Sequence, residues 1–220
     1  MDRPPSSPAG RIGGRLDVVA SLSEPIPGVF AWTNVHPNHG MEVWSYWVPA
    51  SRAVIDPLLA DHQGTDAFAE EPPQRVLLTN RHHLRSSERF ARELGTTINC
   101  HRAGLHEFEG GPEVIGFDWG EEVAPGIEAL EVDAICDEET ALLIAERKAL
   151  SIADSIVRDG GRLGFVSDGL LGDDSEGVKR GIREAYSKLL DRDFDHLLFA
   201  HGDPLIGEGK AALRAFCEAG

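Results

Sequence analysis

Short apolar runs separated by turn residues dominate the first half of the chain. Segments 28–33 (GVFAWT) and 43–48 (VWSYWV) are rich in aromatic and β-branched residues, and segment 51–57 (SRAVIDP) passes through a turn into a second such run. Segment 74–79 (QRVLLT) is a continuous apolar run, which is typical of a strand buried on both faces. The first half is therefore predicted to form a β-sheet.

One amphipathic segment follows the fourth of these strands. Residues 86–94 (SSERFAREL) place Phe90 and Leu94 four positions apart, on one helical face, and Gly95 follows directly. The next segment, 96–100 (TTINC), is again apolar and β-branched. This order of strand, helix and strand predicts a βαβ unit.

The second half repeats this alternation. Its expected strands are 114–118, 127–132, 140–145, 149–152 and 194–200, and its expected helices are 175–190 and 209–218. The pattern predicts an α/β fold in which helices cover the faces of the sheets. Residues 1–14 are rich in Pro, Ser and Gly and are predicted to form a disordered leader, and residues 15–220 are predicted to form one domain.

The charge and composition of the chain disfavour several classes of binding partner. The formal charge of −16 disfavours nucleic acid and anionic membranes, because an acidic surface repels polyphosphate. No apolar run reaches the length of a membrane span, and the N-terminal segment does not resemble a signal peptide. The 3 cysteines are odd in number and far apart, which is typical of a protein in the reducing cytoplasm. A small-molecule partner is expected, and the oligomeric state stays open.

Polar residues with ligand chemistry stand at the ends of four predicted strands. They are His82, Cys136, Asp154 and His201. Metal sites use three or four His, Cys or carboxylate ligands, and strand ends can bring such side chains from distant segments to one point. The sequence therefore predicts that these four residues converge on a single site.

These segments also carry a family resemblance. Segment 43–57 looks like the first hairpin of the metallo-β-lactamase-like hydrolase superfamily, and segment 78–82 (LTNRH) stands where its Thr-His-x-His-x-Asp-His signature begins. Segment 153–155 (ADS) resembles the pair that carries the metal-bridging aspartate, and segment 200–204 (AHGDP) resembles the closing Gly-His-Gly motif. The resemblance covers the chain from about residue 28 onward. It implies a four-layer αββα sandwich of two mixed β-sheets with helices on the outer faces.

The chain departs from this signature at several positions. Asn80 stands at the first histidine of the signature, and His82 keeps the second. Leu84 replaces the aspartate and Arg85 the last histidine. Cys136 stands where the family has the histidine of its Gly-His-Thr motif. A complete two-metal site is therefore not expected.

The resemblance implies a reduced ligand set. His82, Cys136 and Asp154, with or without His201, would hold one ion, and thiolate, imidazole and carboxylate together suit zinc or iron better than magnesium. Arg85 would place a positive charge at the second ion position, where repulsion of about 4 kcal/mol at 4 Å disfavours a divalent cation. The sequence leaves open that no ion binds at all.

The sequence leaves the roles of two residues near the signature open, those of Arg85 and His83. Arg85, with Arg81 nearby, could clamp a substrate carboxylate or phosphate, or form an ordinary surface salt bridge. His83 points away from His82 if the loop is extended, which makes it an outer or surface residue. A shift of register could instead bring His83 into the ligand set.

Two functions from different classes follow. The first is a mononuclear, metal-dependent hydrolase of a small ester, thioester or lactone, with Asp154 and Arg85 as the catalytic candidates. The second is a non-catalytic relative that has lost the metal and binds a small molecule or a partner. The fold itself cannot decide between them.

Overall fold

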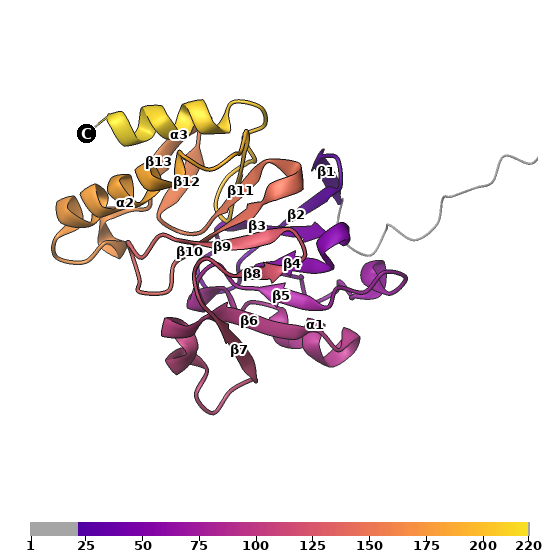
Figure 1. Ribbon diagram of the computed structural model, residues 1–220. Coiled ribbons are helices and arrows are strands. Elements are labelled where there is room, and N and C mark those ends of the chain that lie inside the picture. Colours follow the sequence, from indigo (N-terminus) through magenta and orange to yellow (C-terminus); the bar gives the residue numbers. More distant parts are fainter. Residues whose placement is uncertain (1–21, 220) are drawn as a thin grey trace, which may run out of the picture.

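Two β-sheets face each other in the computed structural model, and helices cover their outer faces (Figure 1). The structure describes residues 22–219. The segment 1–14 that was predicted to be a leader therefore lies outside the described residues. Among residues 22–219, none of the helices has both the length and the apolar character needed to cross a bilayer.

The first sheet has seven strands in the order in which they follow along the chain. They are β1 (Ser23–Ile26), β2 (Val29–Val35), β3 (Glu42–Val48), β4 (Ala53–Ile55), β5 (Arg75–Leu77), β6 (Thr97–His101) and β7 (Val114–Phe117). Pairing is antiparallel from β1 to β4 and parallel from β4 to β7. Helix α1 (Ser87–Leu94) connects β5 to its parallel neighbour β6. The predicted βαβ unit is thereby confirmed.

The second sheet has five strands, in the order β14-β11-β10-β9-β8. Their bounds are β8 (Glu122–Ala124), β9 (Ile127–Glu131), β10 (Thr140–Ile144), β11 (Ala149–Ile152) and β14 (His196–Phe199). A separate hairpin and two helices complete the described chain: β12 (Ile156–Asp159), β13 (Arg162–Phe165), α2 (Ser175–Leu189) and α3 (Gly209–Glu218). Strands β11 and β14 are parallel neighbours, and α2 lies between them along the chain.

Alternate residues of the central strands enter different cores. Ala53 and Ile55 of β4 and Leu77 of β5 belong to the core between the sheets, whereas Val54 and Val76 belong to the core beneath α1. Successive side chains of a strand point to opposite faces, so a strand between two cores needs apolar residues throughout. This requirement explains why continuous apolar runs marked the strands in the sequence.

The outer cores fix the helices to the sheets. Phe90 of α1 is fully buried in the core over the first sheet. Ile182 and Tyr186 of α2, four positions apart, are fully buried with Leu213 of α3 over the second sheet. The layers are therefore helix, sheet, sheet and helix, which confirms the predicted four-layer αββα sandwich.

The predicted strands and helices are confirmed, with ends that differ by a few residues, but four short strands were missed. Strand β1 (SEPI) contains Pro25, and β8 (EVA) is followed directly by Pro125, so neither segment shows the apolar run that marked the other strands. The β12–β13 hairpin turns at Gly160 and Gly161, both of which have positive φ (53° and 80°). Two adjacent glycines between apolar runs are a recognised sign of a two-residue hairpin turn. The sequence therefore contained a signal for this hairpin.

The two sheets are hydrogen-bonded directly to each other at β3 and β14. The buried Tyr46 hydroxyl donates to the Phe199 carbonyl oxygen at 2.8 Å, and the Trp44 amide donates to the Ala200 carbonyl at 2.9 Å. These bonds hold the end of β14, and thus the residues that follow it, against the first sheet.

We expect Tyr46→Phe to lower the free energy of unfolding by about 1–2 kcal/mol, because it removes a buried hydrogen bond and leaves the carbonyl without this donor. Urea denaturation followed by tryptophan fluorescence measures the change. Tyr186→Phe is a comparison for stability, because the Tyr186 hydroxyl also makes a buried bond, to Ser155 Oγ at 3.0 Å, but this bond does not join the two sheets.

Candidate functional site

The carboxyl ends of strands from both sheets meet at one edge of the sandwich. Asp154 follows β11 and His201 follows its parallel neighbour β14, so the two side chains lie close together. From the first sheet, Asp56 follows β4 and the turn at Arg81–His83 follows β5. Sites of α/β proteins form at strand ends of this kind.

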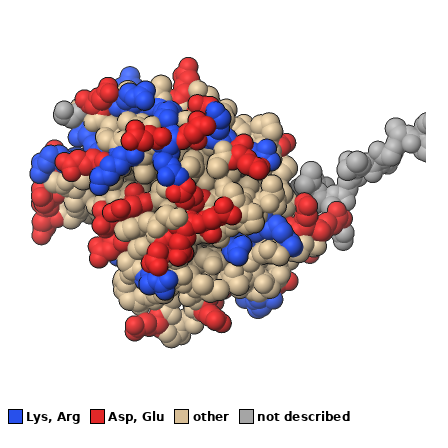
Figure 2. Space-filling model, in the orientation of Figure 1, with Lys and Arg blue, Asp and Glu red and all other residues tan. Residues whose placement is uncertain are grey.

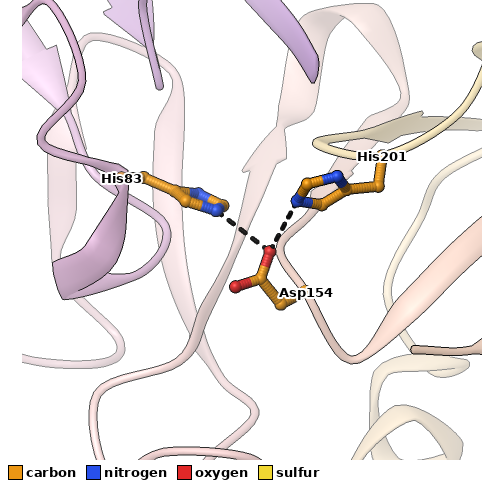
Figure 3. A group of neighbouring side chains, drawn as sticks. All are labelled: His83, Asp154 and His201. Carbon is orange, nitrogen blue, oxygen red and sulfur yellow. Dashed lines mark hydrogen bonds and ion pairs between the residues drawn. The ribbon is translucent and has the colours of Figure 1, made fainter. Parts of the chain in front are cut away.

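Three side chains form the centre of this site (Figure 3). His83 Nε2 lies 2.9 Å and His201 Nε2 lies 3.0 Å from the same oxygen, Oδ1 of Asp154. Their candidate ligand atoms all lie within 4.8 Å of one another. Within residues 22–219, this is the one group of three or more His, Cys or carboxylate side chains that is close enough to share an ion.

The turn after β5 selects His83 rather than His82. Asn80 caps this turn: its Oδ1 accepts the amide of His82 at 2.9 Å, and its carbonyl accepts the amide of His83 at 2.9 Å. Successive side chains of a 3₁₀ turn differ in direction by about 120°. His82 is consequently exposed, whereas His83 is 4% exposed and points at Asp154. The sequence-based ligand set contained His82, and the structure places His83 in the cluster in its stead.

The inner side of the His83 ring is fixed by Asp56 and Thr79. His83 Nδ1 lies 3.0 Å from Asp56 Oδ2 and 3.1 Å from the Thr79 hydroxyl oxygen. The Thr79 amide and hydroxyl both donate to the Asp56 carboxylate, at 3.0 and 2.5 Å. Asp56 is 2% exposed. This arrangement sets the direction of the imidazole before any ligand binds.

The charges of the cluster shift two pKa values. Burial and the Arg85 charge act to lower the pKa of His83, but the carboxylates of Asp154 and Asp56 outweigh them and raise it to about 9. Burial acts to raise the pKa of Asp154, but His83 and His201 hold it well below the usual value. At neutral pH, the metal-free site is therefore a carboxylate hydrogen-bonded to a protonated His83.

Cys136 lies beside the cluster but is joined to it through Asn80. Asn80 Nδ2 donates to Cys136 Sγ at 3.4 Å and to Asp154 Oδ2 at 3.2 Å. Burial and the neighbouring Glu138 raise the pKa of the Cys136 thiol. The predicted residue is thus close to the site, but an amide group separates its sulfur from Asp154.

Arg85 binds backbone carbonyl groups beneath the site. Its Nη1 donates to the carbonyl oxygens of Trp44 at 2.9 Å and Asp56 at 2.8 Å. Burial lowers the pKa of Arg85, and the charges of Asp56 and Asp154 oppose this. Arg81, the other half of the suggested clamp, pairs with the buried Glu138. The contacts of Arg85 therefore hold β3 and β4 together beneath the cluster.

A histidine hairpin lies next to the cluster. The ring of His39, in the loop between β2 and β3, lies 6.4 Å from the ring of His201. His36 stacks on His39 with a centroid distance of 4.0 Å. Both Nδ1 atoms accept backbone amides within the loop, from Asn38 and Met41. The hairpin thus brings two further imidazoles near the open side of His201.

Glu139 is a buried carboxyl group that was not among the residues predicted from the sequence. It is fully buried and accepts the amides of Ser155 at 2.8 Å and Ile135 at 3.3 Å. Burial raises its pKa to about 7. Since Ser155 follows Asp154 directly, Glu139 fixes the backbone that presents Asp154. A charged residue between polar neighbours is normally exposed, so no pattern in the sequence indicated this role.

The donor set fits one zinc or iron ion. Two imidazole nitrogens and one carboxylate oxygen approach a common point, which is a donor set that zinc and iron accept and that leaves a coordination position open. The contact of His83 with Asp56 supplies the outer partner that metal-bound histidines usually have. His83, Asp154 and His201 could therefore hold one such ion once the His83 proton is displaced.

Comparisons with known proteins agree on the fold. Neither a family model nor a curated protein matches the sequence. Solved structures do match. A metallo-β-lactamase family protein from Thermus thermophilus has 16% identity and a TM-score of 0.63, with 88% of this chain and 79% of that chain covered.

Two further structures are similar to the same degree. The metallo-β-lactamase FIM-1 from Pseudomonas aeruginosa, in its mono-zinc form, has 15% identity and a TM-score of 0.66 over 92% of this chain and 96% of that chain. A protein in a di-iron-bound form has 16% identity and a TM-score of 0.57 over 85% and 94%. At this identity, the likeness is one of fold. The chain thus has the metallo-β-lactamase fold, which the resemblance of its strand-end motifs implied.

Proposed function

We propose that this protein is a mononuclear, metal-dependent hydrolase in which His83, Asp154 and His201 hold the ion. The single observation that carries the proposal is the convergence of His83 Nε2 and His201 Nε2 on one oxygen of Asp154. Zinc or iron is the proposed ion, which is consistent with the mono-zinc and di-iron forms of proteins with this fold. A small ester, thioester or lactone is the proposed substrate class.

The ligand set of this proposal differs from the sequence-based one at two positions. His82 is left out because its side chain is exposed, and His83 takes its place. Cys136 is left out because the Asn80 amide stands between its sulfur and Asp154. Asp154 and His201 remain. Arg85 becomes a positioning residue, since its Nη1 binds two backbone carbonyls.

The residues of the site have distinct tasks in such a reaction. An ion bound there would lower the pKa of a water molecule and polarise a substrate carbonyl. Asp56 would accept a hydrogen bond from the N–H group at His83 Nδ1, which leaves Nε2 free as a ligand atom. Asp154 would neutralise part of the charge of the ion. The histidine hairpin, through His39, lies where it can contact a bound substrate.

Charge supports a small-molecule partner over nucleic acid. The chain carries 37 acidic and 21 basic residues. On the face drawn in Figure 2, the Lys and Arg side chains over α2 and α3 are interspersed with Asp and Glu. A surface of this kind offers no continuous basic track to a phosphate backbone. The three free cysteines suit a reducing compartment, and we propose the cytoplasm.

A non-catalytic binding protein is the second candidate. It is favoured by one observation, that His83 Nε2 and His201 Nε2 both lie within hydrogen-bonding distance of Asp154 Oδ1, so that the three side chains can satisfy one another directly. Because a polar site that is complete in this way has no need of a metal, the two candidates differ in whether an ion displaces the His83 proton.

Metal content separates the two candidates. We expect protein purified without added metal to contain about one zinc or iron per chain, and His83→Ala to lose it, with affinity reduced by more than about 100-fold. His82→Ala is the matched control, because this neighbouring histidine is exposed and lies outside the cluster. Elemental analysis after dialysis against a weak chelator gives the stoichiometry.

Two results would contradict the proposal. If the unmodified protein binds no zinc or iron, even after reconstitution with excess metal, the hydrolase proposal fails and the binding protein stands. If His82→Ala loses the ion and His83→Ala keeps it, the turn presents the other histidine and the proposed ligand set is wrong. Ester, thioester and lactone hydrolysis is then assayed only with variants of known metal content.

A further inference from the structure

We infer that Asn80 keeps shut a second cation position, formed by Cys136 Sγ and Asp154 Oδ2, and thereby limits the site to one ion. The inference rests on the proposed function, since it concerns the far side of the same Asp154 carboxylate. It identifies Asn80 as the residue that determines the metal stoichiometry. The observations that carry it are the two contacts of the Asn80 amide nitrogen and the burial of this side chain.

The two oxygens of Asp154 face different partners. Oδ1 is approached by His83 and His201 at 2.9 and 3.0 Å, which is the proposed ion position. Oδ2 is approached by Asn80 Nδ2 at 3.2 Å. A carboxylate can bind a cation at each oxygen, so the Asn80 side is the place where a second ion would have to bind.

A sulfur ligand lies on the same side. Asn80 Nδ2 also donates to Cys136 Sγ at 3.4 Å, so the amide nitrogen lies between a thiol and a carboxylate oxygen. A zinc ion that joined the same two groups would lie about 2.0–2.3 Å from each of them. The NH₂ group therefore occupies the space of the cation, and it makes the same two contacts with partial positive charge alone.

Asn80 cannot easily move aside. The residue is 1% exposed, and its Oδ1 accepts the amide of His82 at 2.9 Å. Rotating the amide by 180° would turn an oxygen toward Asp154 and leave the His82 amide facing an NH₂ group. The cap of the turn thus fixes which end of the amide faces Cys136 and Asp154.

The isosteric change Asn80→Asp should open this position. Aspartate retains an oxygen for the His82 amide, so the cap and the direction of His83 are preserved. Its second oxygen replaces the NH₂ group and faces Cys136 and Asp154, with carboxylate, carboxylate and thiolate as the donors. Without an ion, two carboxylates in contact repel each other, and a divalent cation relieves this repulsion.

The test compares metal content and thermal stability of three proteins. With zinc in excess and then removed by dialysis, the unmodified chain is expected to hold one ion and Asn80→Asp two. The double variant Asn80→Asp with Cys136→Ala, which keeps the cap of the turn but lacks the sulfur ligand, should return to one. The melting temperature of Asn80→Asp should fall below that of the unmodified protein in chelator and rise more strongly with zinc.

Cobalt gives a second readout. A thiolate bound to Co²⁺ produces a charge-transfer absorption in the near ultraviolet, which is expected for Asn80→Asp and absent in the unmodified chain and the double variant. This signal reports on Cys136 directly and does not depend on activity.

The inference is judged by the difference between Asn80→Asp and the unmodified protein. One additional ion per chain, with the cobalt–thiolate absorption, supports it. Equal stoichiometry in the two proteins overturns it, whatever that stoichiometry is. A metal-free unmodified protein refutes the proposed function alone, so the two failures are distinguishable.

Discussion

Asp154→Asn is expected to lower the free energy of unfolding of the metal-free protein by about 3 kcal/mol, because it leaves a buried, protonated His83 with one carboxylate fewer. The size of the change, its dependence on pH and the simultaneous loss of the ion all follow from the central position of this side chain. Asn preserves the shape of the residue and can still accept a hydrogen bond, so the change tests charge rather than packing. The side chain of Asp154 is 24% exposed, which places the effect at the lower end of the range for buried ion pairs.

The measurement is urea denaturation at pH 7 in the presence of a chelator. Asp203→Asn is the matched control, since Asp203 lies two residues from His201 and is exposed. It makes the same change of charge but should alter the free energy of unfolding by less than about 0.5 kcal/mol. If the two variants are equally stable, the charge of Asp154 contributes nothing to the fold, and the cluster is not ionised in solution.

Raising the pH from 6.5 to 9 is expected to lower the free energy of unfolding of the metal-free protein by about 3 kcal/mol. The cause is His83, whose pKa is raised from 6.5 to about 9 in the folded state. The folded protein binds this proton more tightly than the unfolded chain does. The stabilisation is therefore complete below pH 6.5 and is lost as the pH rises through 9.

A second buried group, Glu139, also makes the folded protein less stable as the pH rises, but over a lower pH range. Burial raises the pKa of Glu139 to about 7, so stability also decreases as this carboxyl ionises between its normal pKa of 4.5 and 7. The series is therefore measured in a Glu139→Gln background, which removes the contribution of this carboxyl group and keeps that of His83. A stability that stays level from pH 6.5 to 9 in that background shows that His83 is neutral in the folded protein.

The fold was predictable because the requirements of a four-layer sandwich appear directly in the chain. Strands between two cores need apolar side chains on both faces, and segment 74–79 shows such a run. Asp154 and His201 were predictable for a related reason. Both follow apolar strands, and β11 and β14 proved to be parallel neighbours.

The identity of the third member of the cluster depended on local geometry. An extended loop would have turned His82 and His83 to opposite sides, and the strand-end pattern favoured His82. The Asn80 cap instead forms a tight turn that exposes His82 and buries His83. Asparagine is a preferred capping residue, so this signal was present. The pairing of His83 with Asp56 joins residues 27 positions apart, and no local pattern predicts such a contact.

The assembly of the site from both sheets has a consequence for folding kinetics. Asp56 and His83 belong to the first sheet, whereas Asp154 and His201 belong to the second, and 71 positions separate His83 from Asp154. Contacts over such a separation close large loops and form late. Because the binding site is complete only when the two sheets have come together, a ligand of this cluster should slow unfolding more than it speeds refolding.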